Sequence, residues 1–141
     1  MSTSTTILWA TESGRAKACA RRTMRLLAQK SLPVTQIIID GCHSFDDIDF
    51  LSFGQQKQKR LLILFISTTG DAELPSSMHT QQTWSKLLSK SISSTHTNFA
   101  NIQFALFALG DRAYGPDAFC AAGRKVANRL VQLGALPVCN L

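Results

Sequence analysis

Three short segments of this 141-residue sequence place glycine beside hydroxyl, carboxylate or aromatic side chains, and each could contribute to a binding site. They cover residues 11–16 (TESGRA), 67–75 (STTGDAELP) and 109–120 (LGDRAYGPDAFC). Glycine lets the backbone approach a ligand closely, while hydroxyl and backbone N–H groups suit an anion. The chemistry that these residue types suggest is therefore binding of an anionic or ring-containing molecule.

The first segment suits a phosphate. Thr11 and Ser13 supply hydroxyls, Gly14 supplies a permissive backbone, and the sequence that follows is helical in pattern. Charge-assisted hydrogen bonds contribute about 1.5–3 kcal/mol each, so several of them could hold a dianion. The simpler alternative is that Ser13 only caps the helix. The segment is not a P-loop, because the spacing GxxxxGK[ST] is absent.

The second and third segments suit a flat ring. Gly70 permits close backbone approach, and Asp71 and Glu73 could hydrogen-bond a heterocycle. Tyr114 could stack on a ring, which is worth about 0.5–1.5 kcal/mol beyond the area that it buries. The alternatives are an ordinary Gly-Asp turn in the second segment and a tyrosine packed over its own loop in the third.

An alternation of strands and helices positions these segments. The pattern predicts strands at 6–10, 34–40, 61–67, 102–109 and 136–139, with helices at 14–30 and 119–133 and a shorter one around 84–92. Such an alternation favours right-handed βαβ units around a parallel sheet. Ligands of open parallel sheets bind at the carboxyl ends of the strands, and all three segments follow a strand. We therefore expect the three segments to meet at one edge.

Apolar residues at helical spacing define the buried face of each long helix. In the first helix they are Ala16, Cys19, Ala20, Met24 and Leu27, and in the second Phe119, Ala122, Val126, Leu130 and Leu133. Gly134 stands where a helix C-cap belongs.

The charge of the chain is distributed unevenly. Fifteen Lys and Arg against nine Asp and Glu give +6, and residues 14–30 hold six bases and no acid. A basic helix can bind nucleic acid, but it is more often a solvated face. A surface that stacks the nucleobases of a single strand needs aromatic residues among its basic ones, and no aromatic residue lies among these lysines and arginines. Nucleic-acid binding is therefore the less favoured interpretation.

Composition and length predict one domain over residues 1–141. The longest apolar run, 61–66, is far shorter than the roughly 20 residues of a membrane helix, and the N-terminus lacks a signal-peptide pattern. We therefore expect a cytoplasmic protein without a membrane partner.

The four cysteines form no CxxC pair, which favours free thiols and disfavours a structural zinc site.

Taken together, ILWATESGRA, STTGDAELP and LGDRAYGPDAFCAAGRK resemble the phosphate loop and the two flavin loops of flavodoxin-like FMN domains, in the right order and at the right strand ends. Within the diflavin reductase family, the resemblance is strongest to the N-terminal domain of the cytosolic NADPH-dependent reductases of iron–sulfur protein assembly. It implies a flavodoxin-like doubly wound α/β fold with a five-stranded parallel sheet in the order 2-1-3-4-5. Members of the family end in a further helix that this sequence does not supply.

The resemblance also implies a site. The FMN phosphate would be wrapped by Thr11, Glu12, Ser13, Gly14, Arg15 and Ala16. The ring would lie between two sets, namely Ser67, Thr68, Thr69 and Gly70 on one side and Leu109, Gly110, Asp111 and Tyr114 on the other. No residue acts as a catalytic nucleophile or base in this scheme, because the cofactor carries the chemistry. Single electrons would pass from an FAD/NADPH reductase module, absent from this chain, to an acceptor such as an anamorsin-type iron–sulfur protein.

Departures from the family pattern keep alternatives open. Arg15 stands where the family usually has Asn, Ala72 replaces a common Gly, and Thr69 stands where P450 reductases have an aromatic residue. The segment between Tyr114 and Phe119 is one residue longer than usual. The alternatives are a flavodoxin-like interaction module that has lost FMN, the FMN domain of a P450 reductase or methionine synthase reductase type, and a polyanion binder.

Overall fold

The structure is a computed structural model that describes residues 3–11, 14–29, 37–44, 58–67, 99–109 and 121–138. Its elements, in chain order, are β1 (Thr3–Ala10), α1 (Arg15–Gln29), β2 (Ile37–Ser44), β3 (Arg60–Ser67), β4 (Ile102–Leu109), α4 (Ala121–Gln132) and β5 (Leu136–Pro137).

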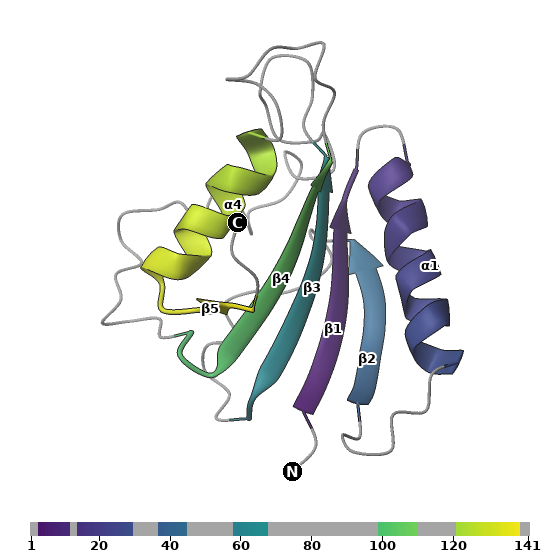
Figure 1. The fold of residues 1–141 in the computed structure, drawn as a ribbon, viewed down its shortest axis with the longest axis horizontal. Coiled ribbons are helices and arrows are strands. Elements are labelled where there is room, and N and C mark those ends of the chain that lie inside the picture. Colours follow the sequence, from purple (N-terminus) through teal and green to yellow (C-terminus); the bar gives the residue numbers. More distant parts are fainter. Residues whose placement is uncertain are drawn as a thin grey trace.

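The five strands form one sheet in the order β2-β1-β3-β4-β5, and every neighbouring pair is parallel. This order is the one predicted from the sequence. Helices α1 and α4 lie on opposite faces of the sheet, which gives three layers (Figure 1). The α/β fold and its doubly wound arrangement are therefore confirmed.

Each face of the sheet has its own apolar cluster, because successive strand residues point to opposite faces. On the α4 face, Leu62, Leu64 and Ile66 of β3 pack with the buried side of α4. On the α1 face, Ile7 and Phe65 pack with Ala16 and Ala20 of the helix, and we call this group the α1 cluster. The two clusters make β3 a strand covered on both sides, as its unbroken apolar run predicted.

Two sequence predictions are corrected. Helical spacing predicts Cys19 on the buried face of the first helix, but its thiol is free and exposed. The sequence pattern ends the second strand at Asp40, whereas β2 continues to Ser44. Pairing with β1 explains the extension, since Trp9 near the end of β1 is in register with Ser44.

Helix α4 ends as the sequence predicted, at a glycine. Gly134 has a positive φ of 103°, and its N–H donates to the carbonyl of Val131 at 3.0 Å. The N–H of Ala135 donates to the carbonyl of Leu130, also at 3.0 Å. These two bonds form a Schellman motif, which satisfies carbonyls at the helix end and turns the chain directly into β5.

Helix α4 also lies unusually close to β4. A Cβ added to Gly123 would stand 2.5 Å from the Cβ of Ala108 and 3.1 Å from Cδ2 of Leu106. Only a residue without a side chain fits this contact, so Gly123 sets the distance between the helix and the strand.

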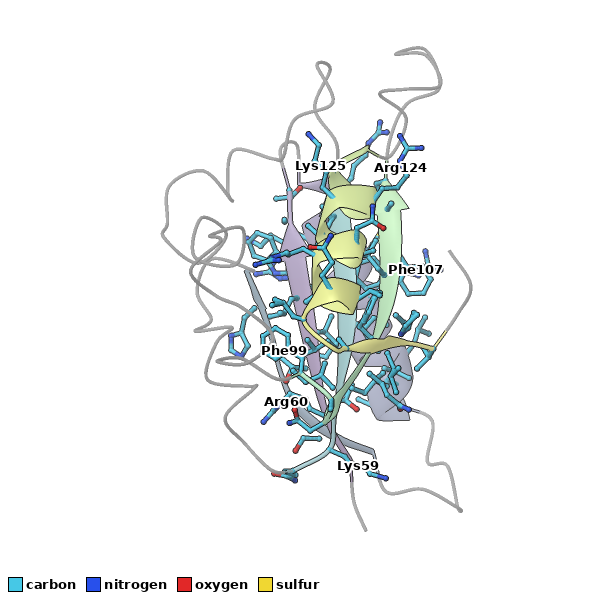
Figure 2. All side chains as sticks on the ribbon, turned by 90° about the vertical axis from the view of Figure 1, so that its left-hand side faces the viewer. Lys59, Arg60, Phe99, Phe107, Arg124 and Lys125 are labelled. Carbon is cyan, nitrogen blue, oxygen red and sulfur yellow. The ribbon has the colours of Figure 1, made fainter. Side chains whose placement is uncertain are left out.

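The amino-terminal end of the sheet contains a buried arginine. Arg60 is only 9% exposed, and its Nη1 donates to Oγ1 of Thr6 at 2.8 Å. Its backbone N–H donates to the carbonyl of Asn101, whose side-chain amide donates to the carbonyl of Gln58. Figure 2 shows Arg60 at the end of the sheet opposite to Arg124 of α4.

The part of β4 nearest its carboxyl end presents apolar side chains to solvent on the α1 face. Phe107 is 51% exposed, and β5 adds Leu136 at 56%, followed by Val138 at 48%.

The short helix predicted around residues 84–92, and Phe119, lie outside the described residues. No helix in the described ranges has both the length and the apolar character to cross a bilayer.

Candidate functional site at the carboxyl ends of the strands

The carboxyl ends of three neighbouring strands bring parts of the three sequence segments to one edge of the sheet. Ala10 of β1 is in register with Ile66 of β3, so Thr11 follows β1 beside the end of β3. Ser67 of β3 is in register with Leu109 of β4. The predicted meeting of the three segments at one edge is therefore confirmed for their first residues, and this edge is the upper one in Figure 1.

The turn from β1 into α1 is built by Thr11 and Gly14. The N–H of Gly14 donates to Oγ1 of Thr11 at 2.8 Å, and the carbonyl of Gly14 accepts the first helical bond from the N–H of Ala18 at 3.0 Å. Gly14 is thus the N-cap of α1, with a φ of 95° that side-chain-bearing residues rarely adopt. Ser13, the alternative cap, precedes this position and lies outside the described residues.

A glycine N-cap contributes no capping side chain of its own to the start of α1. Gly14 has no side-chain oxygen to accept from the first backbone N–H groups of the helix, and a Cβ added to it would meet nothing within 4 Å. Those N–H groups, together with the positive end of the helix dipole, favour an anion. Arg15 is exposed beside them, so the local electrostatics and the available space both fit a phosphate.

Ala16, which the motif places around the phosphate, has its side chain in the core and not in the site. Its side chain is fully buried in the α1 cluster, where it packs between helix and sheet. Only its backbone N–H can face a ligand. Leu109 also packs against the α1 cluster, so its side chain belongs to the core next to the site.

Two side chains beneath the turn were not singled out from the sequence. Trp9 is half-buried in β1, two residues before Thr11, and Nζ of Lys17 lies 5.0 Å from the centre of its ring. This cation–π contact joins β1 to the first turns of α1. The pair is separated by eight residues, a spacing with no sequence signature of its own.

Six of the fourteen predicted site residues are described, and the remaining eight lie outside the described residues. The described ones are Thr11, Gly14, Arg15, Ala16, Ser67 and Leu109. The others are Glu12, Ser13, Thr68, Thr69, Gly70, Gly110, Asp111 and Tyr114, so the ring-binding part of the site stays a prediction. In the described ranges, no group of three or more His, Cys, Asp or Glu side chains could hold a metal ion.

Comparison with known proteins agrees with this architecture. The sequence model of the flavodoxin family matches residues 7–141, and the chain therefore belongs to the flavodoxin family. A solved flavodoxin from Fusobacterium nucleatum, a single-residue mutant bound to flavin mononucleotide, aligns with a TM-score of 0.69 at 17% identity over 98% of this chain and 69% of its own.

Curated proteins similar to this chain include NADPH-dependent oxidoreductases. NADPH-dependent diflavin oxidoreductase 1 of Dictyostelium discoideum is 30% identical over 94% of this chain and 19% of its own length. The sulfite reductase [NADPH] flavoprotein alpha-component of Buchnera aphidicola (subsp. Acyrthosiphon pisum) is 30% identical over 92% of this chain and 19% of its own. The chain spans about a fifth of the length of these relatives.

Proposed function

We propose that this chain binds FMN at the carboxyl edge of its sheet and carries electrons. The observation that carries the proposal is the turn of Thr11 and Gly14, which places the N-terminus of α1 beside the ends of β3 and β4. This turn offers a phosphate site next to two strand ends that can carry ring-binding loops. The flavin-bound relative of known structure supports the choice of FMN as the ligand.

Each described residue has a definite part in this site. Thr11 holds the N–H of Gly14 and so fixes the turn, while the first backbone N–H groups of α1 and the guanidinium of Arg15 would hold the phosphate. Ser67 and Leu109 place the two following loops beside each other. Bound flavin supplies one- and two-electron chemistry, and the protein contributes binding, orientation and exclusion of water.

The source and destination of the electrons are inferred from the relatives. Their names describe NADPH-dependent flavoproteins, and this supports an FAD/NADPH reductase module as the donor. The acceptor that we favour is an iron–sulfur protein of the anamorsin type in the cytoplasm. The corresponding domain of a sulfite reductase flavoprotein is the competing assignment, and it would hand electrons to a different acceptor.

The decisive experiment is a titration of the purified apo-protein with FMN, followed by quenching of flavin fluorescence. We expect saturable binding of about one FMN per chain, weakened about tenfold by Thr11→Val because the turn loses its internal hydrogen bond. Thr11→Ser keeps the hydroxyl and should restore most of the affinity. Thr23→Val, in the middle of α1 and away from the turn, is the matched control and should bind like the unchanged chain.

Folded protein that does not bind FMN would contradict the proposal and leave the interaction module as the better assignment. Circular dichroism on the same samples shows whether each variant is folded. Equal weakening by Thr23→Val would show that the loss of FMN comes from general destabilisation and not from the turn.

A further inference from the structure

The outward face of α1 carries a row of arginines. Arg15, Arg21, Arg22 and Arg25 are all exposed, and we call them the arginine stripe. At 100° per residue the four positions fall within an arc of about 120°, opposite to the arc of the buried Ala16 and Ala20. With a rise of 1.5 Å per residue, the stripe extends for about 15 Å along the helix.

Nothing in the described structure neutralises the stripe. Helix α1 contains no acidic residue, and no hydrogen bond or ion pair joins the side chain of Arg21, Arg22 or Arg25 to another described residue. On α4, by contrast, Arg129 donates to Gln132 at 3.1 Å, and Arg124 and Lys125 also have interaction partners. Among the described residues, the side chains of Arg21, Arg22 and Arg25 on α1 have no such partner.

The positive charges on α1 lower the stability of the helix itself. Arg21 and Arg25 are four residues apart, and like charges at this spacing repel each other. Arg15 adds a positive charge at the positive end of the helix dipole. A function in recognition would explain why arginines occupy these positions.

We propose that the arginine stripe is a docking surface for an acidic protein, whose carboxylates pair with the guanidinium groups of Arg21, Arg22 and Arg25, while Arg15 stays with the proposed phosphate site. Arginine suits this role because its planar group binds a carboxylate through two hydrogen bonds. The stripe begins at Arg15, next to the Gly14 turn, so a protein docked on it lies beside the proposed FMN site. The partner's role as electron acceptor rests on the proposed function, whereas the docking itself can be measured without cofactor.

Two other classes of partner fit the surface less well. Surfaces that bind single-stranded nucleic acid combine lysine or arginine side chains with aromatic residues, and residues 14–29 contain no aromatic residue. A helix that lies on a membrane inserts an apolar face, but the apolar face of α1 is packed on the sheet, where Ala16 and Ala20 are fully buried. An acidic protein requires neither feature.

The test is the binding of a fluorescein-labelled 20-residue peptide rich in Glu and Asp, followed by fluorescence anisotropy at low and physiological salt. We expect the double variant Arg21→Gln/Arg25→Gln to weaken binding about tenfold or more, because two of the three docking arginines are lost. The matched control is Arg124→Gln/Lys125→Gln, which removes the same charge from the opposite face of the sheet and should change affinity less than about threefold. A peptide with Gln in place of each acid should not bind.

Equal losses in the two double variants, or no binding of the acidic peptide at low salt, would overturn the proposal. The same titrations with a single-stranded oligonucleotide and with phosphatidylserine vesicles test the other classes. Tighter binding of either probe through Arg21 and Arg25 would reassign the stripe. An FMN titration of each sample separates the proposals, since a chain that binds the peptide but not FMN keeps the docking surface and loses the electron-carrier role.

Discussion

The rings of Phe65 and Phe107 are stacked across β3 and β4, with their centroids 5.0 Å apart and their planes inclined by 14°. The two residues are in register, and Trp9 on β1 is in register with Phe65 on the other side. One aromatic residue on each of three neighbouring strands thus forms a row on the α1 face, and Nζ of Lys17 lies over the ring of Trp9. Phe65 is 7% exposed, while Phe107 is open to solvent.

The stacked pair can be measured by a double-mutant cycle. We expect Phe65→Ala to lower the free energy of unfolding by about 3–5 kcal/mol, because it removes a buried ring. Phe107→Ala should cost about 1–2 kcal/mol, since half of its side chain is already exposed. Denaturant unfolding of both single variants and the double variant should give a coupling of about 0.5–1.5 kcal/mol, and strict additivity would exclude a specific ring interaction.

Gly123 on α4 predicts an unusual response to a substitution that normally stabilises a helix. Gly123→Ala gains about 1 kcal/mol in helix propensity, but its new methyl group overlaps Cβ of Ala108. We expect a net destabilisation of about 1–3 kcal/mol through overpacking, seen as a lower denaturation midpoint. Asn128→Ala, at an exposed position of the same helix, is the control and should stabilise slightly. A more stable Gly123→Ala would show that helix and strand separate easily.

The bond from Arg60 to Thr6 makes a third prediction. Thr6→Val keeps the shape of the side chain but leaves the buried guanidinium without this acceptor, and we expect a loss of about 1.5–3 kcal/mol in unfolding free energy. Thr6→Ser retains the hydroxyl and should cost less. If Thr6→Val and Thr6→Ser are equally stable by chemical denaturation, the hydrogen bond contributes little and the hydroxyl can be replaced.

Charge removal on α1 should stabilise the fold while weakening the proposed docking. Arg21→Gln removes repulsion from Lys17 and Arg25, which are each four residues away, and we expect a gain of about 0.2–0.5 kcal/mol per pair. The gain should shrink as salt is added, because salt screens exposed charges. Thermal unfolding at low and high salt measures both effects. A loss of stability at low salt would show that Arg21 has a partner that strengthens the folded state.

The sequence predicted the elements whose signals are local. The unbroken apolar run of β3, the helical spacing on α4 and the position of Gly134 all led to the correct structure, because each depends on residues close in the chain. Cys19 was misassigned because its place at the margin of the apolar arc of α1 does not tell which side the sheet covers. In the site, Thr11 and Gly14 were found from the motif, but the pairing of Lys17 with Trp9 was not, because it depends on how α1 crosses β1.

The register of the outermost strand, β2, has a consequence for the behaviour of the protein at high concentration. Thr5 is in register with Ile39 and Thr6 with Gly41, so Asp40 is an extra residue that has no counterpart on β1. Such an irregularity twists a strand and interrupts the even row of donors and acceptors that another sheet could use as a template. We therefore expect the β2 edge to resist edge-to-edge pairing, the first step of β-aggregation, while its pairing with β1 continues on both sides of Asp40.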